Sequence, residues 1–337
     1  MSDAPTSPPD RPGSPLARHP WLTFVLVGMC PVVFLPLGVF GHGVSLAALF
    51  PALAAVLVVS AGDLPDPVPG HGAKRLLVAA GVFVVLLGVA LAKTALADPL
   101  YTVLVTAFPA VLAAWILSGV YSPSAAVRGL VRALASARAP RSAYLVAALA
   151  LPLAVALSVL VCSRLPGIDV GPPRASSAGL LAGWIMTGVF TSALAALAWY
   201  GFAAHRLLRR FRPLAAGLTI GAGQWLLTWG PELRPATLAD PFFLSALTSS
   251  LAVAVVGVWV YRRSAGSLLP VWLMGALLLA ARDLALLMVT PAVVARSDTF
   301  SEVVSAAAVA VALAATVAGR MWRRPAAGEA ASADGAV

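Results

Sequence analysis

Long apolar runs alternate with short polar or basic segments along almost the whole chain. Ten such runs can be placed, at residues 21–40, 44–61, 76–96, 100–119, 143–162, 178–203, 213–229, 242–261, 268–290 and 303–318. A helix of about 20 residues spans roughly 30 Å, which matches the hydrocarbon core of a bilayer. The runs are too long and too uniformly apolar for barrel strands. The pattern predicts an all-α polytopic integral membrane helical bundle of about eight to ten transmembrane helices.

Basic residues are distributed unevenly between the segments that join these runs. If the N-terminal segment is cytoplasmic and the spans alternate, 17 of the 23 Lys and Arg residues fall on the cytoplasmic side and five on the other. This excess follows the positive-inside bias. It predicts an integral plasma-membrane protein with both termini in the cytoplasm. The most densely charged of these segments is 206–212, which holds four arginines.

The composition narrows the function classes. The chain is 60% hydrophobic and 11% charged, which is typical of a protein whose main partner is the lipid bilayer. Its net charge of +10 is explained by arginines at helix ends, so no nucleic-acid partner is expected. Cys30 and Cys162 both lie in apolar runs and are expected to be small packing residues.

Metal and cofactor chemistry have few ligands available in the runs. The histidines are expected in loops or tails rather than in mid-span, at His19, His42, His71 and His205. No cofactor and no metal site are therefore expected.

Three segments fall outside the apolar pattern. Residues 1–20 and 325–337 are rich in small and turn-forming residues and are expected to be disordered, the first as a cytoplasmic tail before an uncleaved first span. In 122–139, apolar residues recur at helical spacing with arginines off that stripe. This predicts an amphipathic helix on the inner membrane face, with a plain cytoplasmic loop as the alternative. The rest of the chain is expected to consist of N-terminal transmembrane helices in 21–99, a transmembrane core in 100–290 and a last transmembrane helix in 291–324.

The order of motifs around the basic segment 206–212 has a recognisable layout. A span end with the step Gly201-Phe202 is followed by the arginine-rich turn and then by Pro213-Leu214, which starts the next span. Further along, an aromatic-rich span end and a short basic turn precede Gly266-Ser267-Leu268-Leu269. Over about residues 100–287 this layout resembles the CPBP family of intramembrane proteases, which includes CAAX prenyl proteases and bacteriocin-processing enzymes.

The resemblance implies a glutamate pair, an arginine and two histidine-containing motifs, but this chain has other residues there. The matching positions are Ala195, Ala196, Tyr200, Trp225, Trp229, Gly275 and Leu279. None of these side chains is a carboxylate or imidazole that could activate water or hold a metal. The resemblance thus implies a homologue without catalytic residues, which acts on a membrane peptide or protein partner as a binding, regulatory or self-protection protein.

Few polar side chains remain inside the runs. Arg282 and Asp283 lie in the ninth run, and Gln224 lies on the span that would border the family's active site. An ionised group at membrane depth is costly and is a functional candidate by default. The alternative is structural pairing with the preceding outer loop, which offers Glu232, Arg234 and Asp240.

Two other functions stay open from the residues. The first is an active intramembrane protease with displaced catalytic groups, for which Asp283 or Glu232 would supply the carboxylate. The second is a small membrane transporter or accessory protein that uses Arg282 and Asp283. Whether the chain is an enzyme therefore stays undecided at this level.

Overall fold

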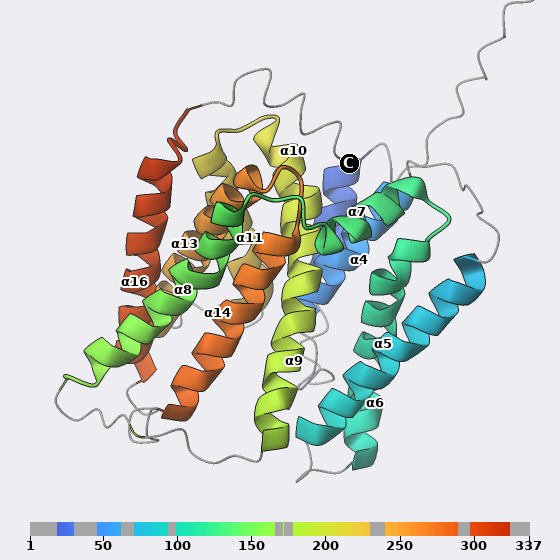
Figure 1. The fold of residues 1–337 in the computed structure, drawn as a ribbon, viewed down its shortest axis with the longest axis horizontal. Helices are drawn as coiled ribbons and strands as arrows, with labels where there is room; N and C mark the ends of the chain where they lie inside the picture. Colours follow the sequence, from blue (N-terminus) through green and yellow to red (C-terminus); the bar gives the residue numbers. More distant parts are fainter. Residues whose placement is uncertain are drawn as a thin grey trace, which may run out of the picture.

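The computed structural model describes residues 19–29, 46–61, 71–93, 99–165, 171, 178–229, 240–288 and 297–323, and within these ranges it is helical with no strand (Figure 1). The helices are α2 (Pro20–Gly28), α4 (Leu46–Ala61), α5 (His71–Lys93), α6 (Pro99–Leu117), α7 (Ala125–Ala135), α8 (Arg141–Cys162), α9 (Ala178–Ala195), α10 (His205–Leu208), α11 (Pro213–Trp229), α13 (Pro241–Arg263), α14 (Leu269–Met288) and α16 (Ser297–Ala318), with a 3₁₀ turn η2 (Ser118–Tyr121) and a π-helical segment η3 (Ala196–Ala204). The predicted all-α membrane bundle is confirmed.

Each of the ten apolar runs contains one of these helices. Six helical stretches in the described ranges are long and apolar enough to cross a membrane: His71–Gly88, Arg141–Cys162, Ile185–Leu208, Pro241–Arg263, Leu269–Met288 and Thr299–Ala318. Two shorter apolar helices are Ala48–Ala61 and Pro109–Tyr121. The span count of eight to ten stays a prediction, and residues 30–45, 1–18 and 324–337, with Cys30 and most of both tails, lie outside the described residues.

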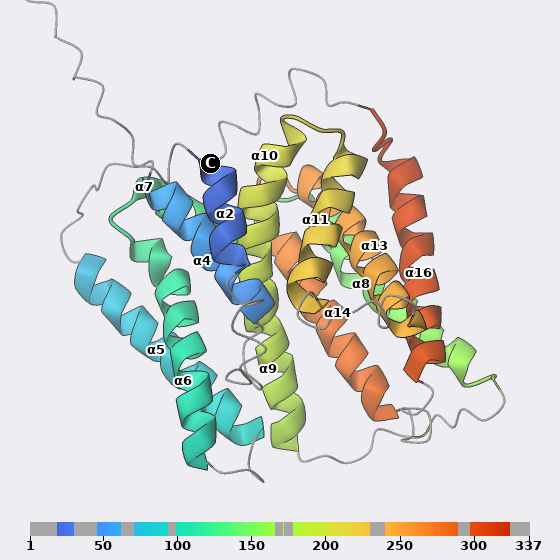
Figure 2. The same cartoon turned by 180° about the vertical axis from the view of Figure 1, so that it is seen from behind.

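The long helices alternate in direction, so that α7, α10 and the C-terminal ends of α13 and α16 gather at one end of the bundle (Figures 1 and 2). We call this the basic end, because the arginine-rich segments lie on these elements. Backbone hydrogen bonds connect them: the Leu268 N–H donates to the Ala133 carbonyl at 2.9 Å, and the Leu214 N–H donates to the Met321 carbonyl at 3.2 Å. This arrangement agrees with the alternation that the charge pattern predicts.

The outer surface of α8 is apolar, whereas its inner face consists largely of small residues. The outward leucines are at least half exposed, at Leu145, Leu149, Leu153, Leu157 and Leu160. The buried face includes Ala143, Ala147, Ala154, Ser158 and Cys162. Small residues let helix backbones approach closely, and a bilayer covers the exposed leucines. Cys162 is a free, fully buried packing residue, as expected.

The segment 122–139 is helical at α7, as predicted, and its place on the inner membrane face stays a prediction. The apolar stripe is buried in the protein core, at Val127, Leu130, Val131 and Leu134. Two glycines make room for it. A Cβ at Gly119 would lie 3.1 Å from side-chain carbons of Val127 and Val131, and one at Gly201 would lie 2.6 Å from Leu130.

The basic segment 206–212 is not wholly a turn. The chain stays helical through η3 and α10 to Leu208, so Arg206 stands on a helix and its guanidinium carbon lies 3.9 Å from the centre of the Phe202 ring. A cation over an aromatic face is favourable where water is scarce. His205, expected in a solvated loop, is half-buried on α10. The helix extends because the aromatic ring and the neighbouring elements cover this stretch.

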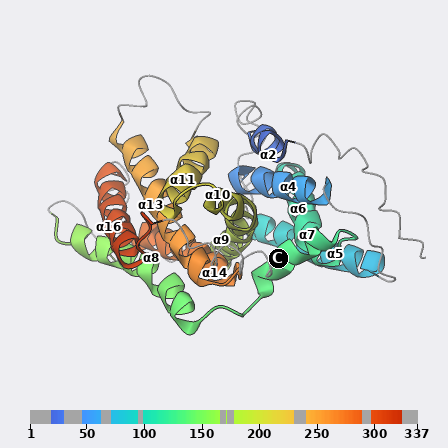
Figure 3. The same ribbon diagram turned by 90° about the horizontal axis from the view of Figure 1, so that it is seen from above.

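The segment η3 lies at the centre of the fold, between α9 and α10 and in contact with α4, α7, α11, α13 and α14 (Figure 3). The short helix α2 reaches it through Phe24, whose ring stacks on Phe202 at 4.9 Å and meets Trp199 edge-on at 5.6 Å.

Helices α11 and α13 touch through glycines. A Cβ at Gly217 would lie 2.9 Å from the Val255 Cα, and one at Gly221 would lie 2.6 Å from the Leu251 Cα. The Ser250 hydroxyl donates to the Gly221 carbonyl at 3.0 Å across the same contact. Gly217 and Gly221 therefore serve close helix packing, because any side chain there would push the two backbones apart.

We predict that Gly221→Ala destabilises the protein, because the new methyl group meets backbone atoms that cannot rotate away. Overpacking of this kind costs about 1–3 kcal/mol. The matched control is Gly81→Ala on α5, where a Cβ would meet nothing within 4 Å. Thermal unfolding of both variants in detergent should show a lowered melting temperature for Gly221→Ala alone. Equal melting temperatures would contradict the close α11–α13 contact.

Candidate functional site

The helices that carry the three CPBP-like motif positions are neighbours in the structure. Helix α14 packs on α9, where a Cβ at Gly275 would lie 2.9 Å from the Ser192 Cβ. The Trp272 indole N–H donates to the Val189 carbonyl at 2.8 Å and links the same two helices. On the other side, a Cβ at Gly223 of α11 would lie 3.0 Å from the Trp199 ring of η3.

The positions that match the glutamate pair and the arginine are packing positions. Ala195 is partly buried against the core, and Ala196 and Tyr200 of η3 are buried. The Tyr200 hydroxyl is hydrogen-bonded to the Gln224 side chain of α11. Its ring also covers Gly257 of α13 so closely that any Cβ there would overlap it. These residues therefore join η3, α11 and α13.

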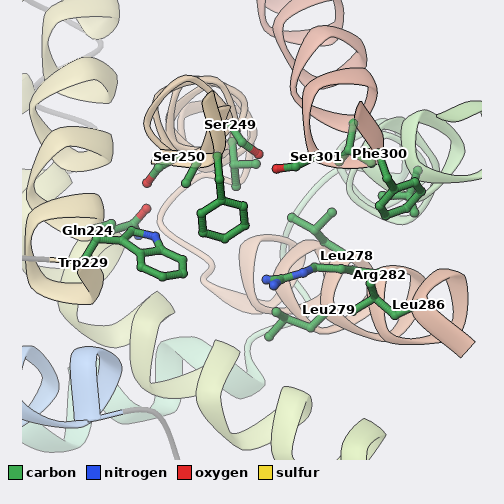
Figure 4. Close-up of a pocket in the computed structure, with 15 residues that line it drawn as sticks. Gln224, Trp229, Ser249, Ser250, Leu278, Leu279, Arg282, Leu286, Phe300 and Ser301 are labelled. Carbon is green, nitrogen blue, oxygen red and sulfur yellow. The ribbon is translucent and has the colours of Figure 1, made fainter. Parts of the chain in front are cut away.

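A cavity of about 340 Å³ lies between α8, α11, α13, α14 and α16 (Figure 4). Its walls are mostly aliphatic and aromatic, and Trp229 meets Phe242 edge-on at 5.2 Å on one side. The polar side chains among the residues that line it are Gln224, Ser249, Ser250, Arg282 and Ser301. We call this space the Arg282 cavity.

Arg282 extends from α14 into the cavity, toward the space between Trp229 and Leu279 (Figure 4). Its neighbour Asp283 is half-buried and does not line the cavity, because consecutive residues of a helix face different directions. Asp240, a candidate partner from the sequence, instead caps α13, where its carboxylate accepts the Phe242 N–H at 2.9 Å. Glu232 and Arg234 lie outside the described residues.

The structure brings only some of the sequence-derived site residues together. Trp229, Leu279, Gln224 and Arg282 line the cavity. The other motif positions are not among the residues that line it: Ala195, Ala196, Tyr200, Trp225 and Gly275. The motif positions therefore do not converge on one cavity.

Sequence reasoning missed the hydroxyl groups of this region. The Ser245 and Ser301 hydroxyls are hydrogen-bonded at 2.7 Å between α13 and α16, and Thr248 and Ser305 pair in the same way. The available signal was a set of small polar residues three or four positions apart on both helices. Such spacing does not show which partner helix they face.

The chemistry available in the cavity is that of binding. The cavity supplies one guanidinium, one amide and several hydroxyls, which can orient a polar group and neutralise an anion. Among its described lining residues, none carries a carboxylate or imidazole that could act as a general base. Across the described ranges, no group of three or more His, Cys, Asp or Glu residues could hold a metal ion.

No protein-family model and no curated protein matches this chain. The resemblance to the CPBP family therefore rests on the order and spacing of motifs quoted above.

We predict that Gly257→Ala destabilises the bundle through Tyr200, since the added methyl group would occupy the space of the phenol ring. The expected cost is about 1–3 kcal/mol. It should shrink in a Tyr200→Leu background, where the ring is gone, and a double-mutant cycle on melting in detergent measures this coupling. Gly88→Ala, with open space around the added Cβ, is the matched control. Additive effects of the two changes at 200 and 257 would argue against the contact.

Proposed function

We propose that this protein binds a membrane peptide or protein partner through a scaffold laid out like the CPBP intramembrane proteases, and does not cut that partner. A regulatory or self-protection role follows from such binding. The observation that carries the proposal is the use of the motif positions Ala196 and Tyr200 as buried packing residues. A catalytic carboxylate at either position would be buried, so it would need polar partners to offset the hydration that it loses.

The adjacency of the three motif helices supports the scaffold part of the proposal. Helix α14 adjoins α9 through Gly275 and Trp272, and α11 adjoins η3, the continuation of α9, through Gly223. The lack of a general base among the described cavity-lining residues supports the non-cleaving part.

The alternative of an active protease with displaced groups has less support. Asp283, its candidate carboxylate within the described residues, lies beside Arg282 on α14 but does not line the cavity. The transport alternative would need a polar route from the cavity to the basic end. On that side, the residues of α13 that follow the cavity include buried Ala254, Val256, Val258 and Val260.

We predict binding without cleavage for single-span membrane peptides, including one with a prenylated C-terminal cysteine. The full chain is reconstituted in liposomes with each labelled peptide, binding is followed by fluorescence anisotropy, and peptide masses are measured after prolonged incubation. Saturable binding with unchanged masses is expected, because no described residue of the cavity wall can act as a general base.

The controls separate the proposal from its alternative. Specific cleavage that is lost in Asp283→Ala and kept in Glu302→Ala, an exposed acid on α16, would establish the displaced-group enzyme instead. Absence of saturable binding to every peptide in the set would contradict the proposed partner class.

A further inference from the structure

We infer that the Arg282 cavity binds a single-chain anionic amphiphile, with the guanidinium on its carboxylate or phosphate head and the apolar walls around its chain. The inference rests on the cavity and not on the CPBP-like layout. It therefore stands or falls separately from peptide binding.

The depth of the polar groups matches such a ligand. Arg282 lies six residues before the end of α14 at Met288, which is about 9 Å along the helix axis. Gln224 lies five residues before the end of α11 at Trp229, about 7 Å from it. Helix α14 ends on the side opposite the basic end, and α11 runs from the basic end toward that side (Figure 2). A lipid whose head lies at that side of the bilayer would place its anionic group near the depth of the guanidinium.

The polar groups that remain available on the cavity wall indicate the charge of the ligand's head. Gln224 is engaged by Tyr200, and the Ser250 and Ser301 hydroxyls are engaged by Gly221 and Ser245. The strongest donor on the cavity wall is then the Arg282 guanidinium, whose planar set of N–H groups matches a carboxylate or phosphate. Among the described residues of the cavity wall, none is acidic and able to neutralise it.

The size and lining of the cavity favour one chain over two. Its volume of about 340 Å³ lies at the lower end of the roughly 300–1,000 Å³ found for small-molecule pockets. Val155 of α8, Leu278 of α14 and Val304 of α16 form aliphatic walls beyond the guanidinium. Phe242 and Phe300 add aromatic faces. These side chains can enclose an alkyl chain but offer it no polar contact.

The test uses the full chain in nanodiscs of zwitterionic lipid and a photoactivatable oleate analogue, with cross-linked peptides located by mass spectrometry. Cross-links are expected in 224–229, 242–253, 278–286 and 300–304. Oleate and oleoyl lysophosphatidate should both compete, because they share an anionic head. Oleyl alcohol should compete at least tenfold more weakly, and inorganic phosphate should not compete. Competition by alcohol equal to that by oleate would overturn the role of charge, and competition by phosphate would overturn the role of the chain.

Variants test the same assignment. Arg282→Gln should weaken oleate binding at least tenfold, whereas Arg282→Lys should retain most of it. Arg164→Gln, an exposed arginine after α8 at the same end of the bundle, should have no effect. Ala246→Phe should fill the cavity and abolish labelling, whereas Leu244→Phe on the exposed face of α13 should not. Wild-type labelling in either Arg282→Gln or Ala246→Phe, with an unchanged melting temperature, would overturn the inference.

Discussion

In a bilayer an apolar side chain gains little by leaving lipid for protein, so helices must associate through close contact and complementary shape. This bundle meets that constraint with glycines that face particular partners. Gly217 and Gly221 bring α11 onto the backbone of α13, Gly257 accepts the ring of Tyr200, and Gly201 accepts Leu130 from α7. The last two contacts converge on η3, which also receives Phe24 of α2. The central segment is therefore held from several sides by shape rather than by charge.

The distribution of polar groups follows from this packing. Toward the basic end, the residues of α13 are apolar and tightly buried, and arginines occur at helix ends, as with Arg206 over Phe202. Toward the opposite end, the Arg282 cavity lies between α11, α13, α14 and α16, and the hydroxyl pair Ser245–Ser301 joins α13 to α16 beside it. A wall of this composition can select a ligand by the charge of its head as well as by its chain. A purely apolar cleft would respond to the chain alone.

The helices and their alternation could be predicted from the sequence because length and hydropathy decide them before any tertiary contact forms. The partner of an amphipathic face could not: the stripe from Val127 to Leu134 has the same pattern whether lipid or protein covers it, and the deciding residues, Gly119 and Gly201, lie outside the stripe. For the site, Arg282 and Gln224 were found because polar groups are rare in apolar runs. Ser249 and Phe242 were missed because their roles depend on which helices face each other. The start of the arginine-rich turn was misplaced because Arg206, over the Phe202 ring, still lies on a helix.

The π-helical segment has a consequence for the tolerance of this chain to insertion and deletion. A π turn holds more residues than an α turn, so the helix faces before and after η3 are rotated relative to each other. Gly188 and Ser192, before it, meet α14, whereas Tyr200 and Gly201, within it, meet α13 and α7. Removing one residue from 196–204 would let the segment relax toward α-helix, and the faces beyond it would turn by less than the roughly 100° that one residue contributes in a regular α-helix, because a π turn accommodates the extra residue. A one-residue deletion is therefore absorbed more readily here than in the regular α-helical stretches, whereas Tyr200 and Gly201 are constrained in identity by the close contacts that they make.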